Sequence, residues 1–214
     1  MTDSYKVLTH TGEAIFRDRG SKFLGFAIPV RSEEEAMTAW AEIQKAHPKC
    51  NHHCYAYRIG EGQDRYRAND DGEPNGSAGR PILGQIDSRG LSDVLVVVAR
   101  YFGGTKLGVP GLINAYKTAA SDALDNGQSG IRRLVTPVKI SFGYELMSPV
   151  MNALNRLEIE MVEQDFAETA RIKIELPRSE AADLLRKFKA YVAGVYLEEV
   201  GEEFTIDNLE INIC

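Results

Sequence analysis

Three segments of the chain gather side chains that can do chemistry. They are His52-His53-Cys54, the acidic stretch from Asp70 to Pro81, and the glycine-rich stretch from Arg100 to Leu112. Carboxylates beside glycines suit a divalent cation or general acid–base catalysis, and imidazole and thiol groups suit zinc or a nucleophile. Glycines that lead into a helix, with cations nearby, suit phosphate groups. The elements around each segment decide between these chemistries.

The acidic stretch places Asp70, Asp71 and Glu73 beside glycines. Such a group can hold Mg²⁺ or supply an acid and a base. It can equally form a turn in which the carboxylates accept hydrogen bonds from neighbouring N–H groups and pair with arginines. The arginines available for such pairs are Arg65, Arg67 and Arg80. Both interpretations stay open. If the acidic stretch packs against the glycine-rich stretch, its carboxylates would neutralise the cations there instead of facing a ligand.

The histidines and cysteines between His47 and Cys54 lack the spacing of a metal site. Cys50 and Cys54 are separated by three residues, and no second Cys/His pair follows downstream. Adjacent strand residues point to opposite faces, so His53 cannot readily form the hydrogen bond that would activate Cys54. We therefore predict no bound metal and no cofactor, with His53 near the acidic stretch in an unassigned role.

The stretch from Gly103 to Gly111 leads from a buried strand into the start of a helix. Free backbone N–H groups and the positive end of the helix dipole meet there, and Arg100 and Lys106 add formal charge. The stretch is not a P-loop, because no G-K-[ST] follows the glycines. One interpretation is contact with a phosphate backbone, with Tyr101 and Phe102 stacking on bases. The other is a set of tight turns with surface-paired cations.

A buried strand organises the first part of the chain. Val94 to Tyr101 is a nearly continuous β-branched and aliphatic run, which is typical of a strand covered on both faces. The other expected elements are a hairpin over residues 13–18 and 22–30 with Gly20 in its turn, a helix between Ser32 and Pro48, a strand over 53–59 and a helix from Pro110 to Asn126.

The second part predicts the order βαββαβ. Strands are expected over residues 135–144, 159–166, 170–176 and 195–200, with helices opened by Ser148-Pro149 and by Ser179. That order within about 75 residues is what a ferredoxin-like sandwich requires. Residues 204–214 can add a further strand, to which the pattern assigns no place.

Charge separates the two parts. Residues 1–134 carry 17 Lys and Arg against 16 Asp and Glu, a net charge of +1, whereas residues 135–214 carry 8 against 15, a net charge of −7. The pI of about 5.3 argues against nucleic-acid binding through bulk charge. The segment from Ala99 to Arg133 nevertheless has a local excess of +3, from five basic and two acidic residues. We predict two domains, residues 1–132 and 133–214.

The composition excludes several classes of protein. Of the 214 residues, 43% are hydrophobic and 26% charged, which is typical of soluble globular proteins. No stretch approaches the roughly 18 apolar residues of a membrane span, and the first residues lack the regions of a signal peptide. Three cysteines make a poor disulfide framework. We expect a cytoplasmic protein without membrane contact.

The three chemical segments resemble the pattern of the IMPACT family in its bacterial YigZ-type form. That pattern contains H-H-C, D-D-G-E-P-x-G-T-A-G-x-P and V-V-V-x-R-Y-[FY]-G-G-x-x-L-G-x-G-G-L-x-x-A-Y, and the match runs over most of residues 15–120. The chain departs from it at Ser77, where threonine is usual, and at Pro110, where glycine is usual. Proline removes one N–H from the start of the helix. The second part resembles the family's smaller C-terminal domain in pattern only.

The resemblance implies an α+β protein with a first domain of the ribosomal-protein and elongation-factor domain IV type and a ferredoxin-like second domain. It also implies non-enzymatic translational regulation, with RNA, a ribosome or a translation-regulatory protein as the partner. The expected binding surface comprises Arg80, Arg100, Gly103, Gly104, Lys106 and Lys117, and the neighbouring candidate ligand loop comprises His53, Asp70, Asp71 and Glu73. Replacing Arg100 and Lys106 by glutamate is expected to abolish binding without unfolding the chain.

Two alternatives stay open. One is a metal-dependent enzyme that acts on a phosphorylated or nucleotide substrate through Asp70, Asp71 and Glu73. The other is a protein-only adaptor whose acidic second part meets a basic partner. Dependence on Mg²⁺ identifies the enzyme, and loss of partner binding after deletion of residues 135–214 identifies the adaptor.

Overall fold

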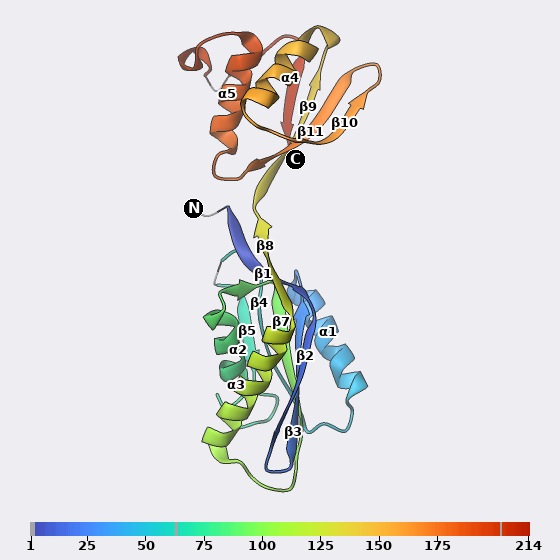
Figure 1. Ribbon diagram of the computed structural model, residues 1–214, viewed down its shortest axis with the longest axis vertical. Coiled ribbons are helices and arrows are strands. Elements are labelled where there is room, and N and C mark those ends of the chain that lie inside the picture. Colours follow the sequence, from blue (N-terminus) through green and yellow to red (C-terminus); the bar gives the residue numbers. More distant parts are fainter. Residues whose placement is uncertain (1–2, 63, 202) are drawn as a thin grey trace. The chain divides into compact units, whose positions relative to one another are not determined.

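The computed structural model describes residues 3–62, 64–201 and 203–214. Within these ranges the chain forms two compact units. The N-terminal unit is Ser4–Arg132, and the C-terminal unit is Arg133–Cys214 together with Asp3 (Figure 1). Both units combine helices with sheets, as the expected α+β class requires.

A five-stranded antiparallel sheet with the order β2-β3-β7-β4-β5 forms the centre of the N-terminal unit. Its strands are β2 (Gly12–Asp18), β3 (Ser21–Pro29), β4 (His52–Arg58), β5 (Tyr66–Asn69) and β7 (Val94–Tyr101). The run expected to be covered on both faces is the central strand β7, and every residue of it except Tyr101 is buried. The predicted hairpin joins β2 to β3 through Arg19 and Gly20, whose φ angles of 44° and 80° suit a tight two-residue turn.

Helices cover both faces of this sheet (Figure 1). They are α1 (Glu33–Ala46) on one face, and α2 (Gly79–Ser88) and α3 (Gly108–Asn126) on the other. Alternation along β7 explains the two cores, because Val96 and Val98 pack with α2 and α3 while Leu95 and Val97 pack on the α1 side. The Ser32 hydroxyl caps α1 by accepting a hydrogen bond from the Glu35 N–H, as predicted.

Several elements of the N-terminal unit are absent from the sequence-based prediction. They are α2, β5 and the strands of a small sheet with the order β6-β1-β8, namely β1 (Ser4–His10), β6 (Leu91–Ser92) and β8 (Gln128–Arg133). Glycines and Pro81 around the start of α2 conceal its helical pattern, and β6 is too short to show a pattern. β8 follows directly on α3, where Gly127 and Gly130 give no strand pattern.

The C-terminal unit has a four-stranded sheet with the ferredoxin-like order β10-β11-β9-β12. Its elements are β9 (Val135–Phe142), α4 (Met147–Arg156), β10 (Met161–Phe166), β11 (Ala170–Pro177), α5 (Ala181–Ala193) and β12 (Leu209–Ile213), with short 3₁₀ turns at Tyr144–Leu146 and Leu197–Glu199. The helices and the sheet enclose a core that includes Ile140, Phe142 and Phe188. The predicted cap at Ser148-Pro149 is wrong, because both residues lie inside the first turn of α4.

The fourth strand of this unit is not where the pattern predicted it. Residues 195–200 form the turn Leu197–Glu199, and the strand beside β9 is β12, from the tail that had no assigned place. Gly194, with φ of 70°, ends α5, and the backbone N–H of Tyr196 donates to the Glu199 carboxylate. The left-handed Gly194 and the Tyr196–Glu199 hydrogen bond stabilise a turn here, although the apolar residues alone suggest a strand.

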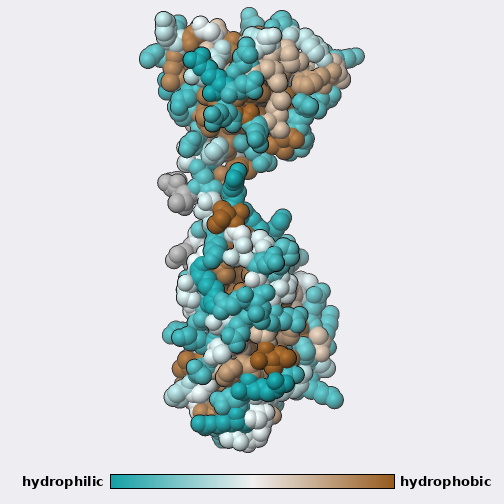
Figure 2. Space-filling view, in the orientation of Figure 1, coloured by the Kyte–Doolittle hydropathy of each residue, from teal (hydrophilic) through white to brown (hydrophobic). Residues whose placement is uncertain are grey.

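Hydrophilic side chains cover most of the visible face of each unit, with hydrophobic ones in small patches (Figure 2). None of the helices in the described parts of the chain combines the length and the apolar character needed to cross a bilayer.

Candidate functional site

The three chemical segments meet at one end of the main sheet, where β4 begins and β7 ends. His52 pairs with Arg100 across these antiparallel strands, so the two side chains lie on the same face, which is the face covered by α2 and α3. Arg89, which follows α2, forms an ion pair with Asp125 near the end of α3. The two helices therefore run in the same direction, and both begin at this end.

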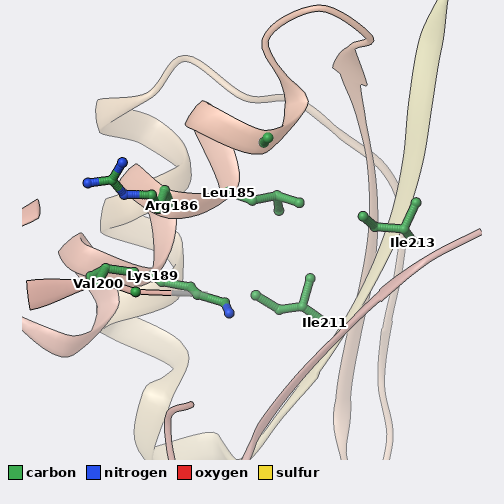
Figure 3. Close-up of a pocket in the computed structure, with 8 residues that line it drawn as sticks. Leu185, Arg186, Lys189, Val200, Ile211 and Ile213 are labelled. Carbon is green, nitrogen blue, oxygen red and sulfur yellow. The ribbon is translucent and has the colours of Figure 1, made fainter. Parts of the chain in front are cut away.

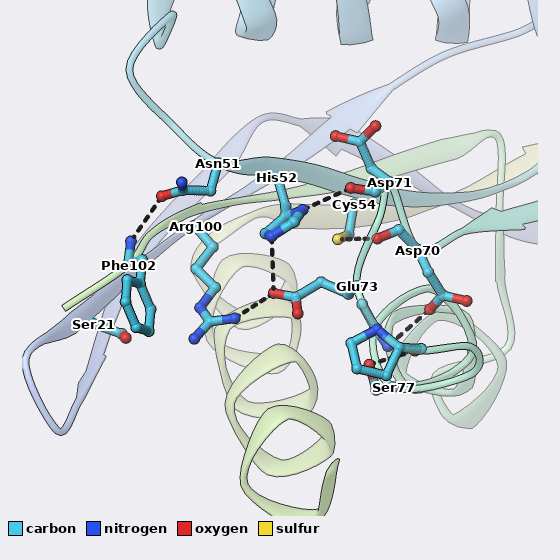
Figure 4. A network of polar contacts seen from close by, with 12 residues as sticks. Ser21, Asn51, His52, Cys54, Asp70, Asp71, Glu73, Ser77, Arg100 and Phe102 are labelled. Carbon is cyan, nitrogen blue, oxygen red and sulfur yellow. Dashed lines mark hydrogen bonds and ion pairs between the residues drawn. The ribbon is translucent and has the colours of Figure 1, made fainter. Parts of the chain in front are cut away.

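A buried ion pair forms the centre of the site. The Arg100 Nη1 group donates to the Glu73 Oε1 atom over 2.6 Å (Figure 4). The Tyr116 hydroxyl donates to the same oxygen over 2.8 Å. The side chains of Arg100 and Glu73 are only 7% and 4% exposed. Burial also raises the pKa of the Tyr116 hydroxyl far above its ordinary value, so this group stays a donor.

One donor of this ion pair is left over. The Arg100 Nε–H group is buried and has no hydrogen-bond partner among the described residues. The guanidinium carbon lies 5.5 Å from the ring centroids of both Phe23 and Phe102. Phe23 is fully buried, whereas Phe102 is 47% exposed. Contact with ring faces compensates a charged donor only in part.

Backbone carbonyls fix the orientation of both histidines. His52 Nδ1 lies 2.7 Å from the Asp71 carbonyl oxygen, and His53 Nε2 lies 3.1 Å from that of His47. A carbonyl can only accept, so each of these nitrogens carries a proton. The other ring nitrogens face carboxylates 4.0 Å away, with His52 facing Glu73 and His53 facing Asp71.

Asp70 caps the start of α2. Its carboxylate accepts hydrogen bonds from the backbone N–H groups of Gly76, Ala78 and Gly79 at 2.8–2.9 Å. Burial raises the pKa of the Asp70 carboxyl, but the three N–H bonds outweigh it and hold that pKa below the ordinary value. The interpretation of this stretch as a turn whose carboxylates accept neighbouring N–H groups therefore describes Asp70, although Glu73 takes a more distant partner.

The metal-dependent alternative does not fit this geometry. Asp70 is used by backbone donors and Glu73 by Arg100 and Tyr116, so the carboxylates do not converge on an open position. Across the described ranges, His, Cys, Asp and Glu side chains form no group of three placed to hold a metal ion. The Cys54 thiol donates to the Asp70 carbonyl, and its burial raises its pKa well above the ordinary value, which makes it a weak nucleophile.

The predicted binding residues separate into two groups. Arg80, Gly103, Gly104, Lys106 and Lys117 are exposed. Arg100 is buried behind them, which corrects the prediction that it lies on the binding surface. Replacing it by glutamate would place a second buried carboxylate against Glu73, so we now expect this substitution to destabilise the fold.

Sequence reasoning missed three residues of the site. Tyr116 belongs to the apolar stripe of α3, and the carboxylate that its hydroxyl bonds lies far away in the sequence. Ser21 and Asn51 position the loop after β7 by accepting hydrogen bonds from the N–H groups of Gly103 and Phe102. The contacts of Ser21 and Asn51 depend on tertiary packing, and no motif quoted above marks these two residues. Tyr116 is the last residue of the glycine-rich family pattern, which marks its position but not its carboxylate partner.

A hollow lies in the C-terminal unit, between α5 and β12 (Figure 3). Leu185, Ile211 and Ile213 line this pocket of about 630 Å³, with Arg186 and Lys189 at its rim. Arg186 Nη2 donates to the Leu197 carbonyl and Lys189 Nζ to that of Phe204. Both cations therefore hold the segment that follows α5, and they are not free for a ligand.

Comparison with known proteins identifies close relatives. The Impact N-terminal domain model matches residues 19–124. "IMPACT family member YvyE" of Bacillus subtilis is 35% identical over 81% of this chain and 80% of its own length, and "IMPACT family member YigZ" of Escherichia coli is 29% identical over 75% and 80%. A solved structure described as a hypothetical protein superposes with a TM-score of 0.64 at 24% identity, over 91% of this chain and 95% of that one. This last likeness supports the two-unit fold.

Proposed function

The chain belongs to the IMPACT family. From this premise we propose that it acts in translation by binding RNA, either the RNA of the ribosome or an RNA through which translation is regulated, and that it catalyses no reaction. The binding surface that we propose consists of Arg80, Lys106 and Lys117 with the loop at Gly103 and Gly104. The observation that carries the proposal is that Lys106 and Lys117 are exposed and have no ion-pair partner among the described residues. Arg80 is also exposed, and its charge helps to lower the pKa of the Asp70 carboxyl.

The electrostatics of the helix ends favour an anion on this surface. Asp70 already occupies the N–H groups at the start of α2. No side chain caps α3, which begins at Gly108 directly after the exposed loop. The partial positive charge at the start of α3 therefore adds to the charge of Lys106. Pro110 removes one donor from this turn but leaves the others.

Exposed apolar side chains near the cations suit contact with bases. Phe102 is 47% exposed, and Val109 and Ile113, one turn apart on α3, are 47% and 38% exposed. Lys117 follows one turn later on the same side of the helix. A surface that mixes cations with an exposed ring is typical of proteins that bind single-stranded or looped RNA.

Binding to purified ribosomal subunits and to a structured RNA, each at two salt concentrations, tests the proposal. The affinity should fall steeply with salt because phosphate contacts release counterions. The variant Lys106→Glu with Lys117→Glu should weaken binding and reduce the slope of log K against log salt by about 2. The matched control is Arg31→Glu with Lys45→Glu, which makes the same change of charge near α1 on the opposite face of the sheet.

Equal weakening by both double variants would show that only net charge matters and would contradict this surface. Absence of RNA and ribosome binding by the unchanged protein would contradict the RNA proposal itself. A translation-regulatory protein would then be the remaining family-based partner.

A further inference from the structure

We propose that Arg100 is the receptor for a single phosphate group, which binds along the Nε/Nη2 edge of its guanidinium after the Phe102 ring moves aside. This inference rests on the proposed function and deepens it, because it adds to the exposed cations a two-donor contact with a single phosphate group. The phosphate can come from an RNA backbone or from a small phosphorylated molecule.

The first step is the geometry of the guanidinium. Its five N–H donors are arranged in a plane and form two edges that can each hold two oxygen atoms. Glu73 takes Nη1, at the end of the group. The side edge, made of Nε and Nη2, is the one that remains, and its Nε–H has no partner among the described residues. Two oxygens of one phosphate match this edge.

The second step is the state of the unused donor. The side chain of Arg100 is 93% buried, because only 7% of it is exposed. A buried charged donor without an acceptor is unfavourable, and native structures rarely keep one unless it has a task. Glu73 and Tyr116 hold the guanidinium in place, so the donor does not have to be ordered when a ligand arrives.

The third step is access. The Phe102 ring lies near the guanidinium, with its centroid 5.5 Å from the guanidinium carbon, and beside Ser21 and Asn51 (Figure 4). It is the exposed one of the two rings near Arg100, and it follows the last residue of β7. Exposed side chains change rotamer within nanoseconds, so rotation of Phe102 can open the edge without moving the strand.

The surroundings favour phosphate over other ligands. Glu73 is already committed to two donors, and the acidic groups Asp70 and Asp71 accept backbone N–H bonds. Residues 102–106, which follow Arg100 closely in the sequence, are all exposed. The Gly103 N–H already donates to the Ser21 hydroxyl, so this loop offers the Gly104 N–H and the positive charge of Lys106. A ligand that carries one doubly charged or diester phosphate meets both.

The test observes the Arg100 Nε–H group directly by ¹⁵N–¹H NMR of the full chain, with its signal assigned through the variant Arg100→Lys. We expect addition of a single-stranded RNA to move this signal downfield, as a new hydrogen bond to an oxygen requires. Inorganic phosphate, used in a parallel titration, reports whether a free phosphate group is sufficient. Phe102→Ala should speed the exchange of this N–H proton with water relative to Phe102→Leu, which retains an apolar cover.

The variant Arg100→Lys supplies the second readout. Lysine keeps a cation for Glu73 but lacks the two-donor edge. We expect RNA affinity to fall by about tenfold to a hundredfold, since one charge-assisted, two-bond contact is lost. Thermal unfolding of the variant shows whether it is folded. If it is not, through-bond correlations within the Arg100 side chain assign the signal, and the NMR titration of the unchanged protein carries the test.

The outcomes separate this inference from the proposed function. RNA binding that is sensitive to salt and to Lys106 but leaves the Arg100 signal unmoved would overturn the Arg100 site and leave the proposed function standing. A shift with inorganic phosphate but none with RNA would support the phosphate site and overturn the RNA source. No shift with either, together with no RNA binding, would overturn both proposals.

Discussion

At the scale of single residues, Glu73 connects groups from three parts of the chain. Its Oε1 atom accepts from Arg100 on β7 and from Tyr116 on α3, and it faces His52 on β4. A buried carboxylate of this kind contributes little net stability by itself, because desolvation offsets the attraction. Its effect is to fix where the guanidinium and the hydroxyl lie, and this is what a preformed binding position needs.

Removal of Glu73 alone should be costly. In the variant Glu73→Ala the Arg100 charge stays buried without its partner, and we expect the free energy of unfolding to fall by about 3–5 kcal/mol. Urea denaturation measures this change. Adding Arg100→Met should restore part of the loss, because the unpaired charge is then absent. Strict additivity of the two changes would contradict a coupled pair.

Asp70 makes a prediction about pH. The pKa of its carboxyl is lowered in the folded chain relative to the ordinary 3.8, so the carboxylate form stabilises the fold. This stabilisation is fully present above pH 3.8 and is lost as the pH falls through the lower pKa of the folded state. The difference in unfolding free energy between the unchanged protein and Asp70→Asn should therefore shrink below about pH 4. A difference that is the same at pH 7 and at pH 3 would contradict the cap.

At the scale of elements, the turn of the first hairpin packs against the loop that follows β7. A Cβ atom on Gly103 would lie 1.9 Å from the carbonyl carbon of Gly20, and the Gly103 N–H donates to the Ser21 hydroxyl. Gly104 has φ of +86° but open space around it. The two neighbouring glycines thus have different tasks, close approach for Gly103 and backbone conformation for Gly104.

Alanine substitution separates these tasks. Gly104→Ala should cost about 1–2 kcal/mol, the strain of a left-handed residue with a side chain. Gly103→Ala should cost more, because the new methyl group overlaps backbone atoms that cannot move independently. The change in the midpoint of thermal unfolding measures both, and an equal effect of the two substitutions would show that the loop does not pack on the hairpin.

The sequence predicted elements well where one interaction dominates. β7 and the helix capped by Ser32 follow from hydrophobic pattern and capping chemistry, and both have the predicted position within about two residues. The last strand was predicted too early because the apolar residues at 195–200 lack the pairing with β9 that Leu209–Ile213 form. Pairing across a sheet depends on distant residues, which a local pattern does not contain.

The sequence also predicted only part of the candidate site. The motifs placed Arg100 on the predicted binding surface and Glu73 and His53 in a neighbouring candidate ligand loop, and the structure places Arg100 against Glu73 over 2.6 Å. They did not show that Arg100 is buried, since a cation at the end of a strand has the same local pattern whether it faces solvent or a carboxylate. The charge of Arg100 is buried because the acidic stretch folds back onto β7, and this tertiary contact cannot be predicted from the local sequence.

At the scale of the whole molecule, the two units differ in charge and have separate cores. Residues 1–134 carry +1 and residues 135–214 carry −7, and the buried clusters of the two units share no residue. The proposed RNA surface belongs entirely to the N-terminal unit. The acidic C-terminal unit would repel a polyanion, which limits RNA contact to the other unit.

Separate cores predict separate unfolding. Phe188 is completely buried in the C-terminal unit, and Phe188→Ala should destabilise that unit by about 3–5 kcal/mol through the cavity that it leaves. In calorimetry we expect one transition to move to lower temperature and the other to stay, while RNA binding below the first transition is unchanged. Ile86→Ala, in the core beneath α2, is the matched variant and should move the other transition. If either substitution shifted both transitions together, the units would fold as one, and the RNA surface could then respond to changes far from β7.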